Sequence, residues 1–174
     1  GKDPPRRLRV AWRGPAGEAW HAAQRGFVSI GADAVPTLLE MLVDSGESPD
    51  HRGGAAHALR EIGARAALDG LLAAVGDADD YTANAAANAA IAIGGADCAP
   101  ALLAHLVRGC TQDGRIAMFF EEVKHEPAVP ALIDLMERAK EDFDRRRALD
   151  ALRFQTGRDL GDTPQAWRRW WETR

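Results

Sequence analysis

Aromatic residues and cysteines are scarce in this sequence, and both shortages narrow the range of folds. Aromatic residues make up 6% of the 174 residues, so the core must consist mainly of Ala, Leu, Ile and Val. Only two cysteines occur. A chain of this length buries roughly 70% of its unfolded surface, so it needs neither a disulfide nor a metal to hold a core together. Hydrophobic residues at 46% and charged residues at 28% are typical of a globular chain.

The main body of the chain also lacks a basic stripe. The net charge is −4, yet residues 1–13 carry five basic groups against one acid, and residues 144–174 carry eight basic groups against five acids. The two ends therefore carry +4 and +3, and the stretch between them carries −11. Because nucleic-acid binders carry basic patches on their main body, we expect no nucleic-acid partner and interpret the basic ends as solvated.

No uncharged run is long enough to predict a transmembrane segment. The longest, residues 81–96, has sixteen residues and contains Asn84 and Asn88, so it is too short and too polar to span a bilayer. No signal-peptide pattern is visible, and the first residue is Gly rather than Met, which indicates removal of a tag, an initiator segment or a signal. A cytoplasmic location is favoured, and a processed extracytoplasmic or lipid-anchored form stays open.

Patterns that carry catalysis are missing as well. None of the three serines lies in a nucleophile elbow, no glycine loop with a lysine could cradle a phosphate, and the five histidines have no metal-ligand spacing. We therefore expect no catalytic residue, no metal site, no cofactor and no enzyme activity. Cys98 and Cys110 flank one predicted helix and cannot bridge each other; a buried structural Cys98 is favoured over a reactive thiol at the helix start. The acidic turn at residues 77–80 predicts a helix N-cap rather than a calcium site.

What the sequence does contain is a repeat of about 31 residues. Related segments align on Phe27, Leu59, Ala90, Phe120 and Leu152, at spacings of 32, 31, 30 and 32. A second block recurs with a similar period behind each of the first four, as in Val35-Pro36-Thr37-Leu38-Leu39. Two independent registers that share one period predict a repeat architecture.

Each repeat predicts two helices, which we call the first-type and the second-type helix. In the first-type helix, positions −4, −1, 0 and +3 about the aligned residue are apolar or small, which is a stripe at helical spacing. Glycine after Ile30, Ile62 and Ile93 suits a helix end, where positive φ is easily adopted. In the second-type helix, prolines fall in the first turn, where a missing N–H is tolerated: Pro36, Pro100 and Pro130.

The pattern Ala-Ala-x-Ala-Leu-x-x-Ile-Gly at residues 55–63, followed by blocks such as Val-Pro-x-Leu-Leu, resembles bacterial HEAT repeats. The likeness is strongest to the short HEAT-like repeats of phycobilin lyases. It implies an all-α fold, an α-α superhelix (HEAT-like solenoid) of about five helical repeats, whose second-type helices line a concave face that binds other macromolecules. Repeat four departs from the pattern, with Phe119-Phe120 and Lys124 where Ala-Leu and Gly are usual, so irregular packing is expected there.

The end of the chain predicts a capping helix. Thr163-Pro164 is a typical helix start, and Trp167, Trp170 and Trp171 then fall on one helix face. The segment resembles a terminal motif found after HEAT arrays, and a solenoid must seal its last apolar face. A Trp-lined ligand surface is the alternative, and Trp12 and Trp20 are candidates for the same role at the other end. The expected organisation is a tether or cap at 1–14, a repeat array at 15–157 and a Trp-rich cap at 158–174.

Helix geometry predicts where a partner binds. Because the apolar stripe is buried, positions −6 and −2 point into the open face, with position +2 beside them. Small residues there, including Gly53 and Gly114, would let a partner's backbone approach, although tight helix packing also selects them. The predicted contact residues on the concave face are Arg25, His57, Asn84, Asn88, Met118 and Glu122.

Three functions compete at this point. The favoured one is a non-enzymatic, monomeric scaffold that binds a protein partner. The phycobilin-lyase resemblance suggests a tetrapyrrole carrier or enzyme, although no acid or thiol stands out to serve such chemistry. The third function follows from a resemblance to HEAT-like DNA glycosylases. The net charge of −11 on the stretch between the two basic ends argues against DNA binding.

Overall fold

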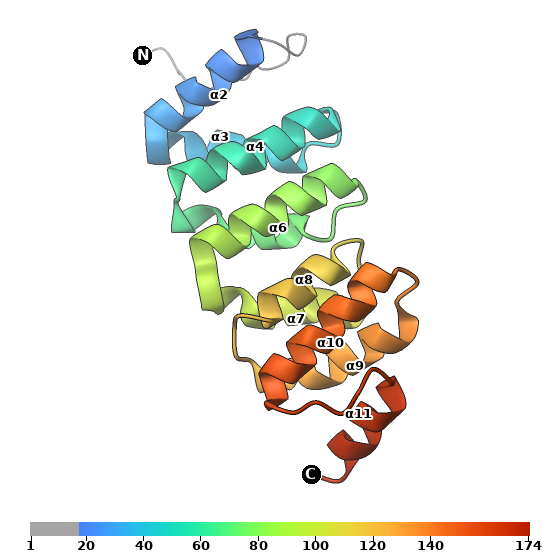
Figure 1. Ribbon diagram of the computed structural model, residues 1–174. Helices are drawn as coiled ribbons and strands as arrows, with labels where there is room; N and C mark the ends of the chain where they lie inside the picture. The colour runs from blue at the N-terminus through green and yellow to red at the C-terminus, as the bar shows by residue number, and fades with distance from the viewer. Residues whose placement is uncertain (1–17) are drawn as a thin grey trace. The chain divides into compact units, whose positions relative to one another are not determined.

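The computed structural model describes residues 18–174, with side chains from residue 22 onward. Over this range the chain forms ten α-helices joined by turns and four short 3-10 helices, and no strand occurs among these residues (Figure 1). The predicted all-α fold is therefore confirmed. The tether expected at 1–14 lies outside the described residues, and so do Trp12 and the side chain of Trp20.

The helices alternate as the two sequence registers predict. The first-type helices are α2 (Glu18–Ile30), α4 (Pro49–Ile62), α6 (Asp80–Gly94), α8 (Asp113–Phe120) and α10 (Asp142–Thr156). The second-type helices are α3 (Val35–Val43), α5 (Leu68–Ala74), α7 (Ala99–Arg108) and α9 (Val129–Arg138), and α11 (Pro164–Glu172) follows the last repeat. The 3-10 helices η1 (Gly31–Ala34), η2 (Arg65–Ala67), η3 (Gly95–Cys98) and η4 (Glu126–Ala128) join the two types.

Local sequence signals account for most helix ends. Pro36 lies in the first turn of α3, and the equivalent prolines open α7 and α9. Ser48 and Asp79 cap α4 and α6 by accepting from backbone N–H groups three residues ahead. Gly63 ends α4 in the left-handed conformation, with φ of 69°. At the end of α6 the positive φ falls on Gly95 and not on the predicted Gly94, which is the last residue of the helix.

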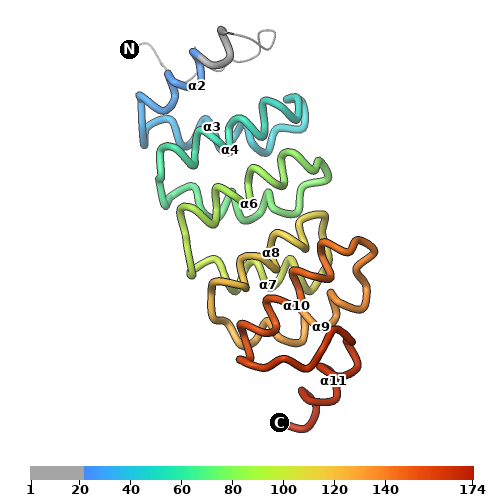
Figure 2. The backbone as a smooth tube through the Cα atoms, in the orientation of Figure 1, coloured from blue at the N-terminus to red at the C-terminus, as the bar shows by residue number. Residues whose placement is uncertain are grey.

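The chain divides into two compact units, Gly1–Gly95 and Ala96–Arg174, called here the N-terminal and C-terminal units. In the N-terminal unit, α2, α4 and α6 pack side by side, and α3 and α5 form a second layer against them. In the C-terminal unit, α8 packs beside α10 and α7 beside α9, while α11 packs against α9 (Figure 2). Each unit is therefore a pair of helix layers with the core between them.

The predicted apolar stripe forms this core. In α4, Ala55, Ala58 and Leu59 are fully buried, as are Ala86, Ala89 and Ala90 of α6. Large side chains supplement them, among them Phe27 in the N-terminal unit and Phe120 in the C-terminal unit. Each such leucine or phenylalanine contributes about 1.5–3 kcal/mol through burial, so the stripe is the main source of stability.

Two stretches, Ala22–Val43 and Asp80–Arg108, are long and apolar enough to cross a membrane by length and composition alone. Each is interrupted by a glycine of positive φ, Gly31 in the first stretch and Gly95 in the second. Core helices of globular proteins meet the same criteria, so these stretches are weak evidence for a membrane span.

Candidate functional site

The six predicted contact residues all lie on first-type helices or directly after one. Four lie on adjacent helices of the N-terminal unit and two lie in the C-terminal unit: Arg25 on α2, His57 on α4, Asn84 and Asn88 on α6, Met118 on α8 and Glu122 just after it. None lies on a second-type helix, although the family resemblance implied that those helices line the binding face. We call the exposed side of the first-type helices in each unit the first-helix face.

Polar contacts connect the first-helix face of the N-terminal unit. Gln24 on α2 donates a hydrogen bond of 3.4 Å to the carboxylate of Glu61 on α4. On α6, the amide of Asn88 donates to the amide oxygen of Asn84 at 2.8 Å. Both asparagines are half-buried, whereas Arg25 is exposed. This face therefore presents the hydrogen-bonded amides of Asn84 and Asn88 on α6 and the exposed cationic side chain of Arg25 on α2.

His57 is the titratable group at the centre of this face. Its ring is half-buried and lies 6.1 Å, centroid to centroid, from the ring of Tyr81 on α6. Burial lowers the pKa of His57 below its usual 6.5, and the charge of Arg60 lowers it further, while Glu61 partly opposes them. The imidazole is therefore mainly neutral at neutral pH and can both donate and accept a hydrogen bond.

Tyr81 lies directly over a glycine of the preceding first-type helix. Gly53 of α4 is buried, and a Cβ atom on it would overlap the Tyr81 ring. The ring itself remains 43% exposed. The missing side chain of Gly53 thus forms a seat that holds a large aromatic side chain at the surface.

The same arrangement recurs in the C-terminal unit. Gly114 of α8 is buried, and a Cβ atom there would overlap the Phe143 ring and the Asp144 carboxylate of α10. Phe143 is 55% exposed, and the guanidinium of Arg147 lies 5.4 Å from its ring centroid. Two repeats therefore present an exposed aromatic ring seated on a glycine and flanked by a basic or imidazole side chain.

These contacts correct one part of the geometric prediction. Positions −2 and +2 are half-buried or exposed, as expected, but Gly53 and Gly114 at position −6 do not line an open face. Each is covered by the next first-type helix, so tight packing explains the glycine. Sequence reasoning missed Tyr81 and Phe143, which both lie nine residues before the aligned residue of their repeats. A comparison of that register position would have found them.

Met118 and Glu122 lie in a more charged setting. Met118 is 40% exposed. Beside it, Arg147 of α10 forms an ion pair of 3.2 Å with Glu121. Burial raises the pKa of Glu121 above its usual value, and the charge of Arg147 opposes that shift. This face therefore combines an apolar side chain with an ion pair that is already made within the unit.

The irregular end of repeat four is closed by side chains rather than by a glycine. Gln155, buried in α10, donates through its amide to the carbonyls of Phe120 and Val123, at 2.6 and 2.7 Å, and its oxygen accepts from the N–H of His125 at 2.8 Å. Lys124 in turn donates to the last carbonyls of α10, those of Phe154 and Gln155. The irregular packing expected in repeat four therefore takes a specific form: Gln155 of α10 caps the end of α8, and Lys124, in the turn after α8, caps the end of α10.

The three tryptophans of the C-terminal helix have different environments. Trp167 is fully buried, and its indole N–H donates to the carbonyl of Gly161 at 2.8 Å. On the same helix, Arg168 forms ion pairs with Asp134 and Glu137 of α9, both at 2.8 Å. Trp170 and Trp171 remain partly exposed. Trp167 therefore has the environment expected of a cap, and the other two leave room for the alternative of a ligand surface.

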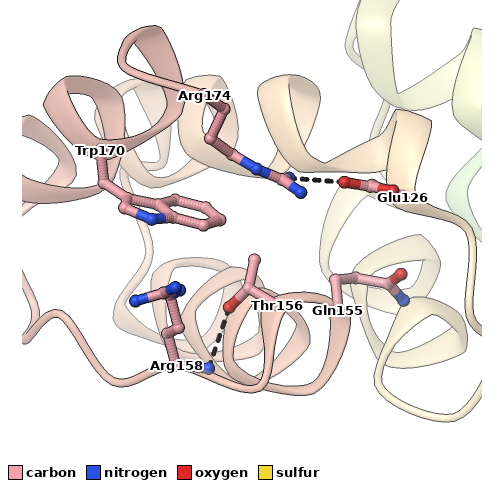
Figure 3. A pocket seen from close by; sticks show the side chains of 6 residues that line it. All are labelled: Glu126, Gln155, Thr156, Arg158, Trp170 and Arg174. Carbon is pink, nitrogen blue, oxygen red and sulfur yellow. Dashed lines mark hydrogen bonds and ion pairs between the residues drawn. The ribbon is translucent and has the colours of Figure 1, made fainter.

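Trp170 lines a pocket of about 340 Å³ in the C-terminal unit, shown in Figure 3. The pocket brings together η4, the end of α10 and the end of α11; its lining residues are Glu126, Gln155, Thr156, Arg158, Trp170 and Arg174. Arg158 and Arg174 place their guanidinium carbons 5.3 and 5.1 Å from the Trp170 ring centroid. Arg174 is also ion-paired with Glu126. Sequence reasoning assigned no role to these two arginines or to Glu126.

The other candidates have structural environments. Cys98 is buried at the start of α7 and Cys110 is half-buried beyond its end, where burial raises the pKa of the thiol. Asp79 caps α6, and Asp77 forms an ion pair with Arg52. Among residues 18–174, no three His, Cys, Asp or Glu side chains lie close enough together to hold a metal ion.

The start of α8 holds a buried carboxylate, Asp113, and a half-buried one, Asp144 of α10, lies near it. Asp113 accepts from the N–H of Cys110 at 3.0 Å and pairs with Arg138 at 2.8 Å. Burial raises the pKa of the nearby Asp144 carboxyl, and the charges of Asp113 and Glu141 raise it further. Ionising Asp144 is therefore less favourable in the folded chain than in the unfolded chain.

Comparison with known proteins decides the family. A sequence model described as HEAT repeats matches residues 20–92 and 35–119, which together span more than half of the chain. The chain belongs to the HEAT-repeat family. This match confirms the resemblance found in the repeat pattern. None of the curated proteins matches the sequence significantly.

Solved structures agree on the fold of this HEAT-repeat protein. A chain of the complex of CpcE and CpcF of phycocyanin lyase from Nostoc sp. PCC7120 aligns with a TM-score of 0.62 at 19% sequence identity. The alignment covers 91% of this chain and 67% of that one. At this level of identity the likeness establishes the fold, and it agrees with the phycobilin-lyase type of repeat.

Proposed function

We propose that this HEAT-repeat protein is a non-enzymatic interaction module that binds a protein partner through the first-helix face. The observation that carries the proposal is the pair of exposed rings, Tyr81 and Phe143, each seated on a buried glycine. Aromatic side chains that are rigidly held and partly exposed are typical anchors of protein interfaces. The two anchors occupy equivalent positions in their repeats.

The six residues predicted from the sequence are the proposed polar and apolar surroundings of these anchors. His57 contacts the Tyr81 ring, and Asn84 and Asn88 lie on the same helix as Tyr81. Arg25 on α2 belongs to the first-helix face of the N-terminal unit. In the C-terminal unit, Met118 and Glu122 accompany Phe143. Fixed amides and a neutral imidazole favour hydrogen bonds to a partner, which supports binding of a protein rather than of a charged polymer.

A mutational test can distinguish this face from the second-type helices. A partner is first captured from lysate with the full chain and purified, and its dissociation constant is measured by isothermal titration calorimetry. Tyr81→Ser is expected to weaken binding at least tenfold, which corresponds to about 1.4 kcal/mol. Val43→Ser is the matched control, since Val43 is an exposed apolar residue on the second-type helix α3. It is expected to leave the affinity within about twofold.

The contrary results are equally informative. If Val43→Ser weakens binding and Tyr81→Ser does not, the second-type helices carry the interface, as the family resemblance implied. The double variant Asn88→Arg plus His57→Glu gives an independent reading: it should abolish binding while the melting curve stays unchanged. Unchanged affinity in that folded variant contradicts the proposed face.

A tetrapyrrole carrier or lyase function is the second candidate, and the fold likeness to a phycocyanin lyase chain favours it. Such a function needs a pocket for a large conjugated ligand. Two pockets of the C-terminal unit have volumes of about 340 and 210 Å³, at or below the lower end of the range of about 300–1,000 Å³ for small-molecule sites. A new visible absorbance band after mixing the protein with a tetrapyrrole would support this candidate over the scaffold.

A further inference from the structure

Arg158 is the basic residue of the Trp170 pocket whose guanidinium forms no ion pair with any residue of the described range. Its acidic neighbour, Asp159, pairs instead with Arg153 at 3.1 Å and accepts from the N–H of Gly161 at 3.1 Å. Both interactions lower the pKa of Asp159, so this carboxylate stays ionised and is engaged by Arg153 and Gly161. The guanidinium of Arg158 lies over the Trp170 ring and keeps its N–H donors available to a ligand.

The fold holds this guanidinium in a defined place. Gly157 ends α10 with a φ of 68°, which turns the chain toward the pocket, and the N–H of Arg158 donates to the hydroxyl of Thr156 at 3.2 Å. In Figure 3 the Trp170 ring lies between Arg158 and Arg174, and the open space continues toward Thr156. A guanidinium placed over an indole loses less freedom on binding a ligand than one on an unsupported side chain.

The charge of the lining selects the ligand. Arg158 and Arg174 contribute two positive charges and Glu126 one negative charge, so the side chains that line the pocket carry +1. One carboxylate neutralises it and can accept two N–H bonds from Arg158, whereas a phosphate dianion would bring excess negative charge beside Glu126. Gln155 lines the same space, but its amide is fully engaged with the end of repeat four.

We propose that this pocket binds one glutamate or aspartate side chain of an acidic peptide segment in a partner protein. Arg158 takes the carboxylate while its guanidinium stays against the Trp170 ring. The volume of about 340 Å³ suits a side chain with its flanking backbone rather than a large cofactor. The inference goes beyond the proposed function, because no pocket residue is one of the proposed contact residues or of the two exposed rings, and either site can fail alone.

The test uses the full chain and two blocked tripeptides, N-acetyl-alanyl-glutamyl-alanine amide and its glutaminyl counterpart. Binding is followed by nuclear magnetic resonance through the indole N–H signal of Trp170, assigned with Trp170→Phe. The glutamyl peptide is expected to shift this signal in a saturable manner, with at least fivefold higher affinity than the glutaminyl peptide. Arg158→Gln should weaken glutamyl-peptide binding at least fivefold.

Arg169→Gln is the matched control, because Arg169 is an exposed arginine of α11, the helix that carries Trp170, and does not line the pocket. It should leave the affinity unchanged. The proposal is overturned if the two peptides bind alike, if Arg158→Gln binds as the wild type does, or if Arg169→Gln weakens binding equally. Tighter binding of inorganic phosphate than of the glutamyl peptide also overturns it and assigns the pocket to phosphate. None of these variants touches Tyr81, so the result is independent of the first-helix face.

Discussion

Replacing Gln155 with methionine tests the capping of repeat four directly. Methionine keeps the length and volume of the side chain but removes both amide donors and the acceptor. The carbonyl of Phe120 then loses its donor in a buried position. Where water has partial access, the carbonyl of Val123 loses its donor and the N–H of His125 loses its acceptor. A buried unsatisfied group costs about 1–3 kcal/mol and a part-buried one about 0.5–1 kcal/mol, so the free energy of unfolding should fall by about 2–5 kcal/mol.

The loss can be measured by urea unfolding followed by far-ultraviolet circular dichroism, with thermal melting as a second assay. A loss of about 2–5 kcal/mol corresponds to a decrease of about 4–20 °C in Tm for a chain of this size. Gln165→Met is the matched control, because Gln165 is exposed on α11 and only its backbone carbonyl accepts a bond. If Gln155→Met unfolds within about 0.5 kcal/mol of this control, the side chain does not close repeat four and the reasoning is refuted.

Three further predictions concern packing and charge. Trp167→Ala should lower the free energy of unfolding by about 3–5 kcal/mol in the same urea assay, and Trp171→Ala, at a partly exposed position, should cost far less. Gly53→Ala should cost about 1–3 kcal/mol, because the new Cβ overlaps the Tyr81 ring, and Tyr81→Ser should relieve most of that loss. Asp144→Asn should stabilise the protein at about pH 7 and not at about pH 3, because the folded state holds the carboxyl proton more tightly than the unfolded chain does.

Each of these predictions has a contrary result. Equal losses from the two tryptophan substitutions would mean that Trp167 is not the cap. A Gly53→Ala loss that persists without the Tyr81 ring would place the strain elsewhere in α4. For Asp144, stability conferred by the protonated form is lost as pH rises through the raised pKa; a benefit of Asn that grows toward low pH would therefore reverse the sign of the shift.

Local sequence signals were sufficient for the helices and their order. Pro36 and its equivalents mark the first turn of second-type helices, because a ring without an N–H fits only there. The stripe that contains Ala55, Ala58 and Leu59 identified the buried side of α4, because helical spacing alone determines which side chains share a face. Ser48 and Asp79 act on backbone N–H groups three residues away, so caps were readable as well.

The candidate sites depended on contacts that no local pattern contains. Helix geometry placed position −6 on the open face, yet Gly53 is covered by Tyr81, which lies at position −9 of the next repeat. Gln155 reaches a carbonyl 35 residues earlier in the chain, and Arg174 pairs with Glu126 across 48 residues. Sequence alone thus determined an all-α HEAT repeat and its buried stripe, since these follow from spacing within one helix. Only the tertiary structure decided which surface side chains meet, since that depends on how separate helices are offset and turned against each other.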